Sequence, residues 1–78
     1  MPTVLRVEGF RFYFFSNENY EPAHVHVRKG GGFAKVWLHP VEIAASSGLT
    51  TQDLRRIRAL TFEHQAFLVG KWNEYFSR

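Results

Sequence analysis

The fold is decided by residues 23–38, which read Ala23-His24-Val25-His26-Val27-Arg28-Lys29-Gly30-Gly31-Gly32-Phe33-Ala34-Lys35-Val36-Trp37-Leu38. Apolar and polar side chains alternate on both sides of the glycines, a pattern typical of two strands with one buried face. With Gly30-Gly31 as a two-residue turn, every residue on one face is apolar, so the pattern itself favours this register. The predicted pairs on the apolar face are Val27–Ala34, Val25–Val36 and Ala23–Leu38; on the other face they are His24–Trp37, His26–Lys35 and Arg28–Phe33.

A second hairpin is expected before this one. Residues 3–7 are rich in β-branched side chains, and residues 10–15 are mostly aromatic. Glu8-Gly9 suits a two-residue turn, because glycine accepts a positive φ. The predicted core-face pairs are Val7–Phe10, Leu5–Phe12 and Thr3–Phe14. On the other face Arg6 lies opposite Arg11, an unfavourable arrangement of like charges that a bound anion or exposure to water would relieve.

The rest of the chain predicts a helix. His39-Pro40 ends the fourth strand, because proline cannot donate to a ladder, and residues 41–44 form either a short edge strand or a single turn. Thr50 is a good N-cap, and Asp53 occupies the capping-box position. Gly70 is a weak point of this helix, because glycine costs on the order of 1 kcal/mol against alanine, and the sequence leaves open whether the helix bends there. The helix stripe that faces the core is Leu54, Ile57, Thr61, His64, Leu68, Trp72 and Tyr75.

These elements predict one α+β domain over residues 1–78. It is a four-stranded antiparallel sheet, made of two β-hairpins and packed on one face by a long C-terminal helix. The composition excludes two kinds of small protein. The chain has no cysteine, so it is neither a disulfide-stabilised domain nor a thiolate metal protein, and this fits a reducing cytoplasm. No apolar run approaches the ~20 residues that cross a membrane. The net charge of +3 favours an anionic partner only weakly.

The helix leaves the second sheet face open, and this face holds the candidate functional residues. We rank a contact surface for RNA or an acidic partner first, a nuclease second, an inert or homodimeric face third and a metal site last, because aromatic clusters usually mark contact sites. The side chains expected on this face are Arg6, Arg11, Tyr13, His24, His26, Arg28, Lys35 and Trp37.

For a metal-independent ribonuclease, His24 and His26 are the candidate acid–base pair, because imidazoles titrate near neutrality. The candidate phosphate-binding residues are Arg11, Arg28 and Lys35, and the candidate stacking residues are Tyr13 and Trp37. In a metal site the third ligand would be His39, Glu21 or Glu18. Nearby cations oppose a metal ion electrostatically, so we expect no metal at this site. We expect no other cofactor either.

Several segments resemble one family of small bacterial proteins, catalogued as domain of unknown function 4160, with members named DhiT-type toxins of type II toxin–antitoxin modules. The most specific part is Glu21-Pro22-Ala23-His24-Val25-His26-Val27. Ala23 departs from the pattern, since many relatives have a second proline there. The family motif positions present are Arg11, Tyr13, Ser16, Glu21, His24, His26, Lys35, Trp37 and Trp72. The resemblance implies a cytoplasmic protein that is neutralised by an antitoxin encoded by a neighbouring gene.

Two functions follow as expectations. The first is a toxin-like component whose basic and aromatic sheet face contacts RNA or another translation-related target, with ribonuclease activity left open. The alternative is a non-catalytic interaction protein that acts by occupying its target and is neutralised by a partner protein.

Overall fold

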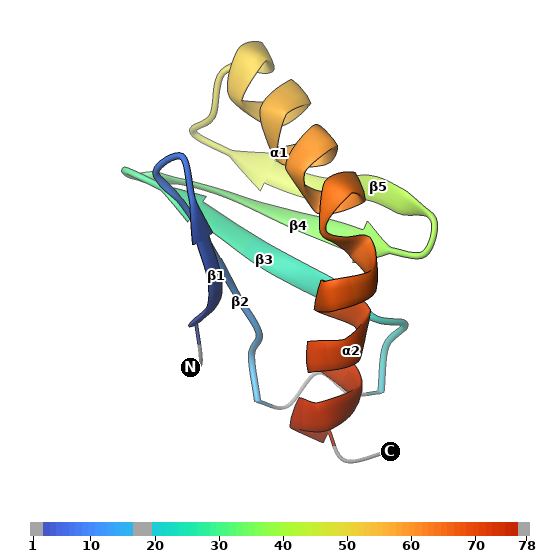
Figure 1. Ribbon diagram of the computed structural model, residues 1–78. Helices are drawn as coiled ribbons and strands as arrows, with labels where there is room; N and C mark the ends of the chain where they lie inside the picture. The colour runs from blue at the N-terminus through green and yellow to red at the C-terminus, as the bar shows by residue number, and fades with distance from the viewer. Residues whose placement is uncertain (1–2, 17–19, 77–78) are drawn as a thin grey trace.

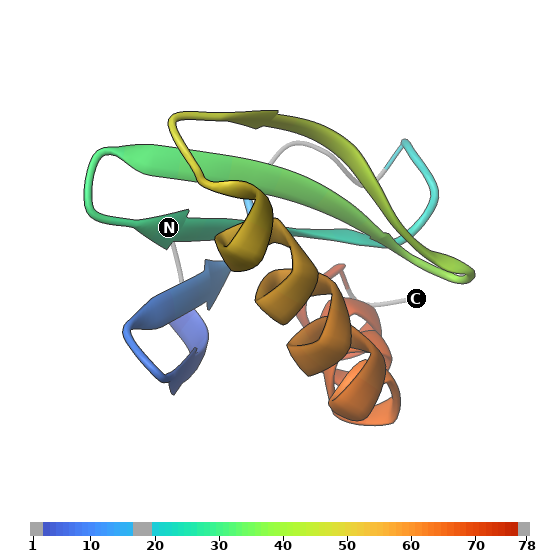
Figure 2. The same cartoon turned by 90° about the horizontal axis from the view of Figure 1, so that it is seen from above.

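Five antiparallel strands follow one another in the order β1-β2-β3-β4-β5, and two helices cover one face of the sheet (Figures 1 and 2). The computed structural model describes residues 3–16 and 20–76. The α+β class and the antiparallel sheet packed against a C-terminal helix are confirmed. The predicted four strands are wrong, because a fifth strand pairs with β4. The elements are β1 (Thr3–Val7), β2 (Phe10–Tyr13), β3 (His24–Lys29), β4 (Gly32–Leu38), β5 (Val41–Ser47), α1 (Thr51–Glu63) and α2 (Gln65–Phe76).

The central hairpin has the register that the alternating pattern predicts. Gly30-Gly31 is the turn, Gly30 has a positive φ of 57°, and Lys29 pairs with Gly32. Five of the six predicted β3–β4 pairs are observed, including His24–Trp37, His26–Lys35 and Arg28–Phe33. The remaining predicted pair, Ala23–Leu38, lies at the open end of the hairpin, just beyond β3. There the Leu38 N–H donates to the Ala23 carbonyl at 3.0 Å. Side-chain alternation was therefore enough to fix this part of the sheet.

The first hairpin follows its predicted register only near the turn. Glu8 and Gly9 both have positive φ, and the pairs Val7–Phe10, Arg6–Arg11 and Leu5–Phe12 are observed. The register then shifts between Thr3 and Leu5, so that Thr3 pairs with Tyr13 instead of Phe14. The prediction of a Thr3–Phe14 pair is wrong, because this bulge inserts one extra residue in β1. β2 ends at Tyr13, and Phe14 is fully buried beyond the ladder.

Residues 41–47 form the strand that the sequence left undecided. β5 pairs with β4 from Leu38–Val41 to Phe33–Ser47, with a register shift between Lys35 and Val36. Only Val41 of this strand is buried. Its small side chains give little hydrophobic alternation, so the backbone ladder to β4 is what holds it as a strand.

The helical region is divided at His64, not at Gly70. Thr50 and Asp53 form the predicted capping box, with the Asp53 N–H donating to Thr50 Oγ1 at 2.9 Å. His64 leaves the helical conformation at φ −106° and ψ 18°, and α2 begins at the next residue. There the Gln65 side chain donates to the Leu38 carbonyl at 2.6 Å, which ties the start of α2 to the end of β4. Gly70, where the sequence left a bend open, lies inside α2.

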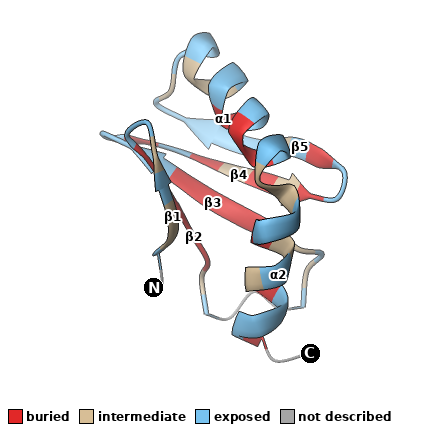
Figure 3. Ribbon diagram, viewed as in Figure 1, coloured by how far each residue is buried: buried red, intermediate tan, exposed pale blue. Residues whose placement is uncertain are grey.

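One cluster of apolar side chains fills the space between the sheet and the helices (Figure 3). The strands contribute aromatic rings from β2 and the apolar faces of β3 and β4, whereas α1 and α2 contribute one stripe each. The predicted helix stripe is correct at Ile57, Thr61, Leu68 and Trp72, but Tyr75 is exposed and Phe76 is buried in its place. Phe14 joins the layers, since its ring contacts Trp72 at a centroid distance of 5.5 Å.

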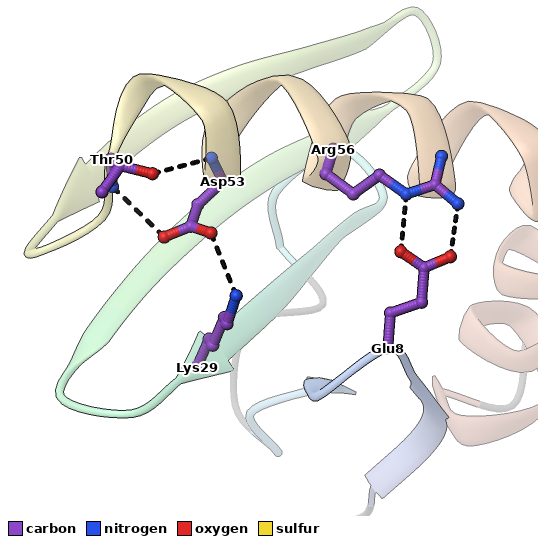
Figure 4. Close-up of polar contacts among 5 residues, drawn as sticks. All are labelled: Glu8, Lys29, Thr50, Asp53 and Arg56. Carbon is purple, nitrogen blue, oxygen red and sulfur yellow. Dashed lines mark hydrogen bonds and ion pairs between the residues drawn. The ribbon is translucent and has the colours of Figure 1, made fainter.

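Two ion pairs fasten α1 to the strand ends (Figure 4). Arg56 of α1 holds Glu8 through two hydrogen bonds, one from Nε to Oε1 at 2.6 Å and a second from Nη2 to Oε2. Lys29 Nζ donates to Asp53 Oδ1 at 3.1 Å. The Arg56 guanidinium lowers the pKa of Glu8, and Lys29 together with the Thr50 backbone lowers the pKa of Asp53. Within the described residues, neither helix is long and apolar enough to cross a membrane.

Candidate nucleic-acid interface

Three arginines lie side by side on the sheet face that points away from the apolar core. Arg6 of β1 is directly opposite Arg11 of β2, and Arg11 is directly opposite Arg28 of β3. We call these three residues the arginine row. Neighbouring strands are about 4.8 Å apart, so the row spans about 10 Å. Both outer arginines are exposed, and no carboxylate among the described residues pairs with any of the three.

Arg11, in the middle of the row, is held in place by its neighbours. Its Nε donates to Thr3 Oγ1 at 2.7 Å, and its guanidinium carbon lies 4.7 Å from the centre of the Tyr13 ring. The bond to Thr3 uses Nε and leaves the two terminal amino groups to other acceptors. Arginine presents such groups in a planar fork that matches a phosphate. The arrangement of the row therefore suits the binding of an anionic group.

An exposed aromatic ring extends the arginine row onto the next strand. Phe33 of β4 is opposite Arg28, and 38% of its surface is accessible. The two predicted stacking residues are less available. Tyr13 is buried between Arg11, Phe15 and His26, while Trp37 is partly covered by Lys35, whose Nζ lies 4.6 Å from the ring centre. Phe33 is thus the best-placed ring on this face for stacking with a base.

The two histidines are close together but buried. Their ring centroids are 5.2 Å apart, and the exposed fractions are 0% for His24 and 7% for His26. His24 also contacts Trp37 and Trp72, at centroid distances of 5.5 Å and 5.0 Å. Its Nδ1 donates to the Pro22 carbonyl at 2.9 Å, because a carbonyl oxygen can only accept. The His26 ring contacts the Phe15 ring at a centroid distance of 4.4 Å and is stacked on the Tyr13 ring at a centroid distance of 5.6 Å.

A carboxylate closes this group of side chains. Lys35 Nζ donates to Glu21 Oε1 at 2.6 Å, and the same oxygen lies 4.0 Å from His24 Nδ1. Lys35, expected to bind phosphate, is therefore already paired with an acid. We call the whole group the histidine cluster; its members are Tyr13, Glu21, His24, His26, Lys35 and Trp37.

The second sheet face is thus divided into two parts, which differs from the expectation of one open surface. The end with the arginine row is open, whereas the end with the histidine cluster is covered by Phe15, by the segment Glu21-Pro22 and, at His24, by Trp72 of α2. Figure 1 shows α2 passing the start of β3. The cause is that alternation fixes the direction of a side chain but does not show which other segments of the chain fold over it.

The covering of the histidine cluster limits which histidine could act as a general acid or base. A general acid or base must reach the reacting group, and His24 has no accessible surface through which a substrate could touch it. His26 has a small accessible surface. The geometry suits His24 for orienting its neighbours and leaves His26 as the histidine that a bound molecule can reach.

The His, Asp and Glu side chains of the described residues are not arranged as a metal site. Among residues 3–16 and 20–76, no group of three or more His, Asp or Glu side chains is placed to hold an ion. Of the candidate third ligands, Glu21 is paired with Lys35, His39 is exposed in the β4–β5 turn, and Glu18 lies outside the described residues.

Some members of the interface were not among the residues predicted to bind or react. Arg6 and Phe33 were placed on the correct face but were not assigned to phosphate binding or to stacking, and Glu21 was considered as a metal ligand and as a family motif position. The signal for Arg6 and Phe33 was present in the hairpin registers, which set them beside Arg11 and Arg28. Nothing in the spacing indicated that Glu21 would turn back to Lys35 across 14 residues.

The comparisons with known proteins give one finding. No curated protein and no solved structure is significantly similar to the chain. A family model described as Domain of unknown function (DUF4160) matches residues 9–73, which include the arginine row from Arg11 onward and all of the histidine cluster. The match spans most of the chain, and the protein therefore belongs to the DUF4160 family.

Proposed function

We propose that this protein is a toxin-like component of a bacterial toxin–antitoxin pair, and that it acts in the cytoplasm by binding RNA through the arginine row. The observation that carries the proposal is the direct cross-strand pairing of Arg6, Arg11 and Arg28 with no acidic partner among the described residues. Like charges in this position destabilise a sheet, and a phosphate backbone would remove the repulsion. The toxin-like role is the one that the resemblance of the motif residues implies.

The mode of action that we favour is occupancy. His24 is inaccessible and Lys35 is paired with Glu21, so two of the residues expected to do chemistry contribute to the packing of the sheet end instead. The arginine row and Phe33 can bind phosphates and a base without reacting with them. In this proposal the antitoxin from the neighbouring gene neutralises the protein by covering the same face.

The first test is RNA binding as a function of salt. Fluorescence anisotropy with a labelled single-stranded RNA would compare the wild type with the Arg6→Gln/Arg28→Gln variant. Each phosphate contact changes the slope of log K against log[salt] by about 0.7 for single strands, so the slope should become shallower by about 1.4. Arg58→Gln, on α1, is the matched control and should leave the slope unchanged. An equal slope in all three proteins would refute the proposal.

Ribonuclease activity is the second candidate, and the 5.2 Å separation of the two imidazoles favours it. The discriminating variant is His26→Gln, checked for folding by its melting curve. Loss of RNA cleavage in EDTA and loss of growth arrest in this variant would support a nuclease. Growth arrest that survives His26→Gln but is lost in Arg6→Gln/Arg28→Gln would support occupancy.

A further inference from the structure

A second surface feature lies on α1 and has no part in the proposed RNA interface. It is a groove of about 600 Å³ between α1 and the turn that joins β4 to β5. Its lining residues are Pro40, Val41, Arg55, Arg58, Ala59 and Phe62. Pro40 and Val41 form one side, and α1 forms the other. Residues 55, 58, 59 and 62 are three or four positions apart, so they form one continuous stripe on the helix surface.

Phe62 is the unusual member of this stripe. Its side chain is 70% exposed, although Leu60 and Thr61 beside it are buried in the core. Burying an aromatic ring of this kind typically removes 150–250 Å² from water, so an unburied ring next to an apolar groove is a strong candidate for an anchor. Together with Pro40, Val41 and Ala59 it makes the lining mainly apolar.

The two arginines at the rim give the groove its charge. Arg55 and Arg58 have no acidic partner among the described residues, whereas Arg56, on another side of the same helix, holds Glu8. Arg55 also lies near the N-terminus of α1, where the helix dipole disfavours cations. A cleft on the Glu8 side of the helix shares Arg55 and Ala59 with this groove, but its other two cations, Lys29 and Arg56, are already paired with Asp53 and Glu8. The groove therefore offers an apolar centre and two arginines that have no acidic partner within residues 3–16 and 20–76.

We infer that this groove binds an acidic amphipathic segment of a protein partner. A large apolar side chain of the segment would pack on Phe62, and flanking carboxylates would bond to Arg55 and Arg58. The mainly apolar lining favours a peptide over a nucleic acid, which would need phosphate contacts along its length. The inference does not depend on RNA binding, since the arginine row lies on β1, β2 and β3.

The test is a selection of binding peptides from a displayed library of random 12-residue sequences, with the full chain as target. The expected peptides place Asp or Glu around one aromatic or leucine residue. Their affinity should fall more than about tenfold in Phe62→Ala, since aromatic anchors dominate such interfaces. It should also fall more than about tenfold in Arg55→Gln/Arg58→Gln, because the carboxylates lose their partners.

Two control variants separate the groove from other surfaces. Phe67→Ala, which removes a ring that is 45% exposed on α2, and Arg28→Gln, in the arginine row, should both bind the selected peptides as the wild type does. Melting curves establish that each variant is folded. Peptides without acidic residues, or binding that is insensitive to Phe62→Ala, would overturn the inference. An RNA affinity that falls in Arg55→Gln/Arg58→Gln as much as in the arginine-row variant would also overturn it, in favour of a nucleic-acid site.

Discussion

Replacing Arg28 by glutamine should make the isolated protein more stable while making it bind RNA less tightly. Arg28 is exposed and lies directly opposite Arg11, which is in turn opposite Arg6. Like charges opposite each other on a sheet cost about 0.2–1 kcal/mol. Glutamine keeps two of the three methylene groups beside Phe33 and removes the charge, so the main change is relief of repulsion.

The size of the stability change can be estimated from this geometry. A gain of about 0.5 kcal/mol in the free energy of unfolding corresponds to a rise of about 2–4 °C in melting temperature for a domain of this size. At 1 M salt the Debye length is about 3 Å, so repulsion between the exposed guanidinium groups is screened and the difference should largely disappear. Thermal melts of Arg28→Gln and the wild type at low and high salt measure both effects.

The same variant should lose one phosphate contact. Its salt slope for single-stranded RNA should be shallower by about 0.7, which amounts to a loss of about fivefold in affinity at 0.1 M salt. Arg58→Gln is the control, because it removes an exposed arginine from α1 with no arginine opposite it on a neighbouring strand. A lower melting temperature for Arg28→Gln at low salt, or a stability difference that persists at 1 M salt, would show that repulsion between the guanidinium groups of the arginine row does not destabilise the sheet.

Three further predictions concern the framework that holds this face. Gly32→Ala should destabilise the protein by more than about 1 kcal/mol in urea unfolding, because a Cβ at this position would lie 2.7 Å from Leu49 Cδ2 and closer still to the Gly48 carbonyl. Asp53→Asn should make the protein's stability fall less steeply as the pH is lowered. Because the pKa of Asp53 is lowered in the folded state, the stabilising effect of its carboxylate is present above about pH 4 and is lost as the pH falls through the folded-state pKa. Thermal melts of the variant and the wild type from pH 7 to pH 3 would detect the difference. His24→Ala should cost about 2–4 kcal/mol in urea unfolding, because it leaves a fully buried cavity and removes the donor to the Pro22 carbonyl; a loss below about 1 kcal/mol would contradict the packing role.

The sequence was most informative where side chains alternate strictly. The β3–β4 register followed from apolar pairing alone, and so did the placing of His24 and His26 beside Trp37 and Lys35. The capping box at Thr50 was equally direct, because its chemistry is local. In both cases the interactions that decide the structure lie between residues close together in the chain.

The remaining features depend on contacts that a local pattern does not contain. β5 exists because its backbone pairs with β4, although its side chains are mostly small and exposed. The helices divide at His64, next to the point where Gln65 bonds to Leu38, whereas the glycine that looked like a weak point lies within an intact helix. The histidine cluster is buried because Glu21 and Phe15 turn back onto it. For this reason the sequence predicted the members of the cluster but not their accessibility.

The strand order has a consequence for how the chain folds. Each strand pairs with the strand that precedes it in the sequence, so every ladder of the sheet can form as a local hairpin. Short sequence separation lowers the entropy lost on closing each loop and favours rapid folding. The contacts of longest separation are those between residues 8–14 and the helices, such as Glu8 with Arg56 and Phe14 with Trp72. We therefore expect the rate-limiting step to be the docking of the helices onto an already paired sheet, with core substitutions in α2 accelerating unfolding more than they slow folding.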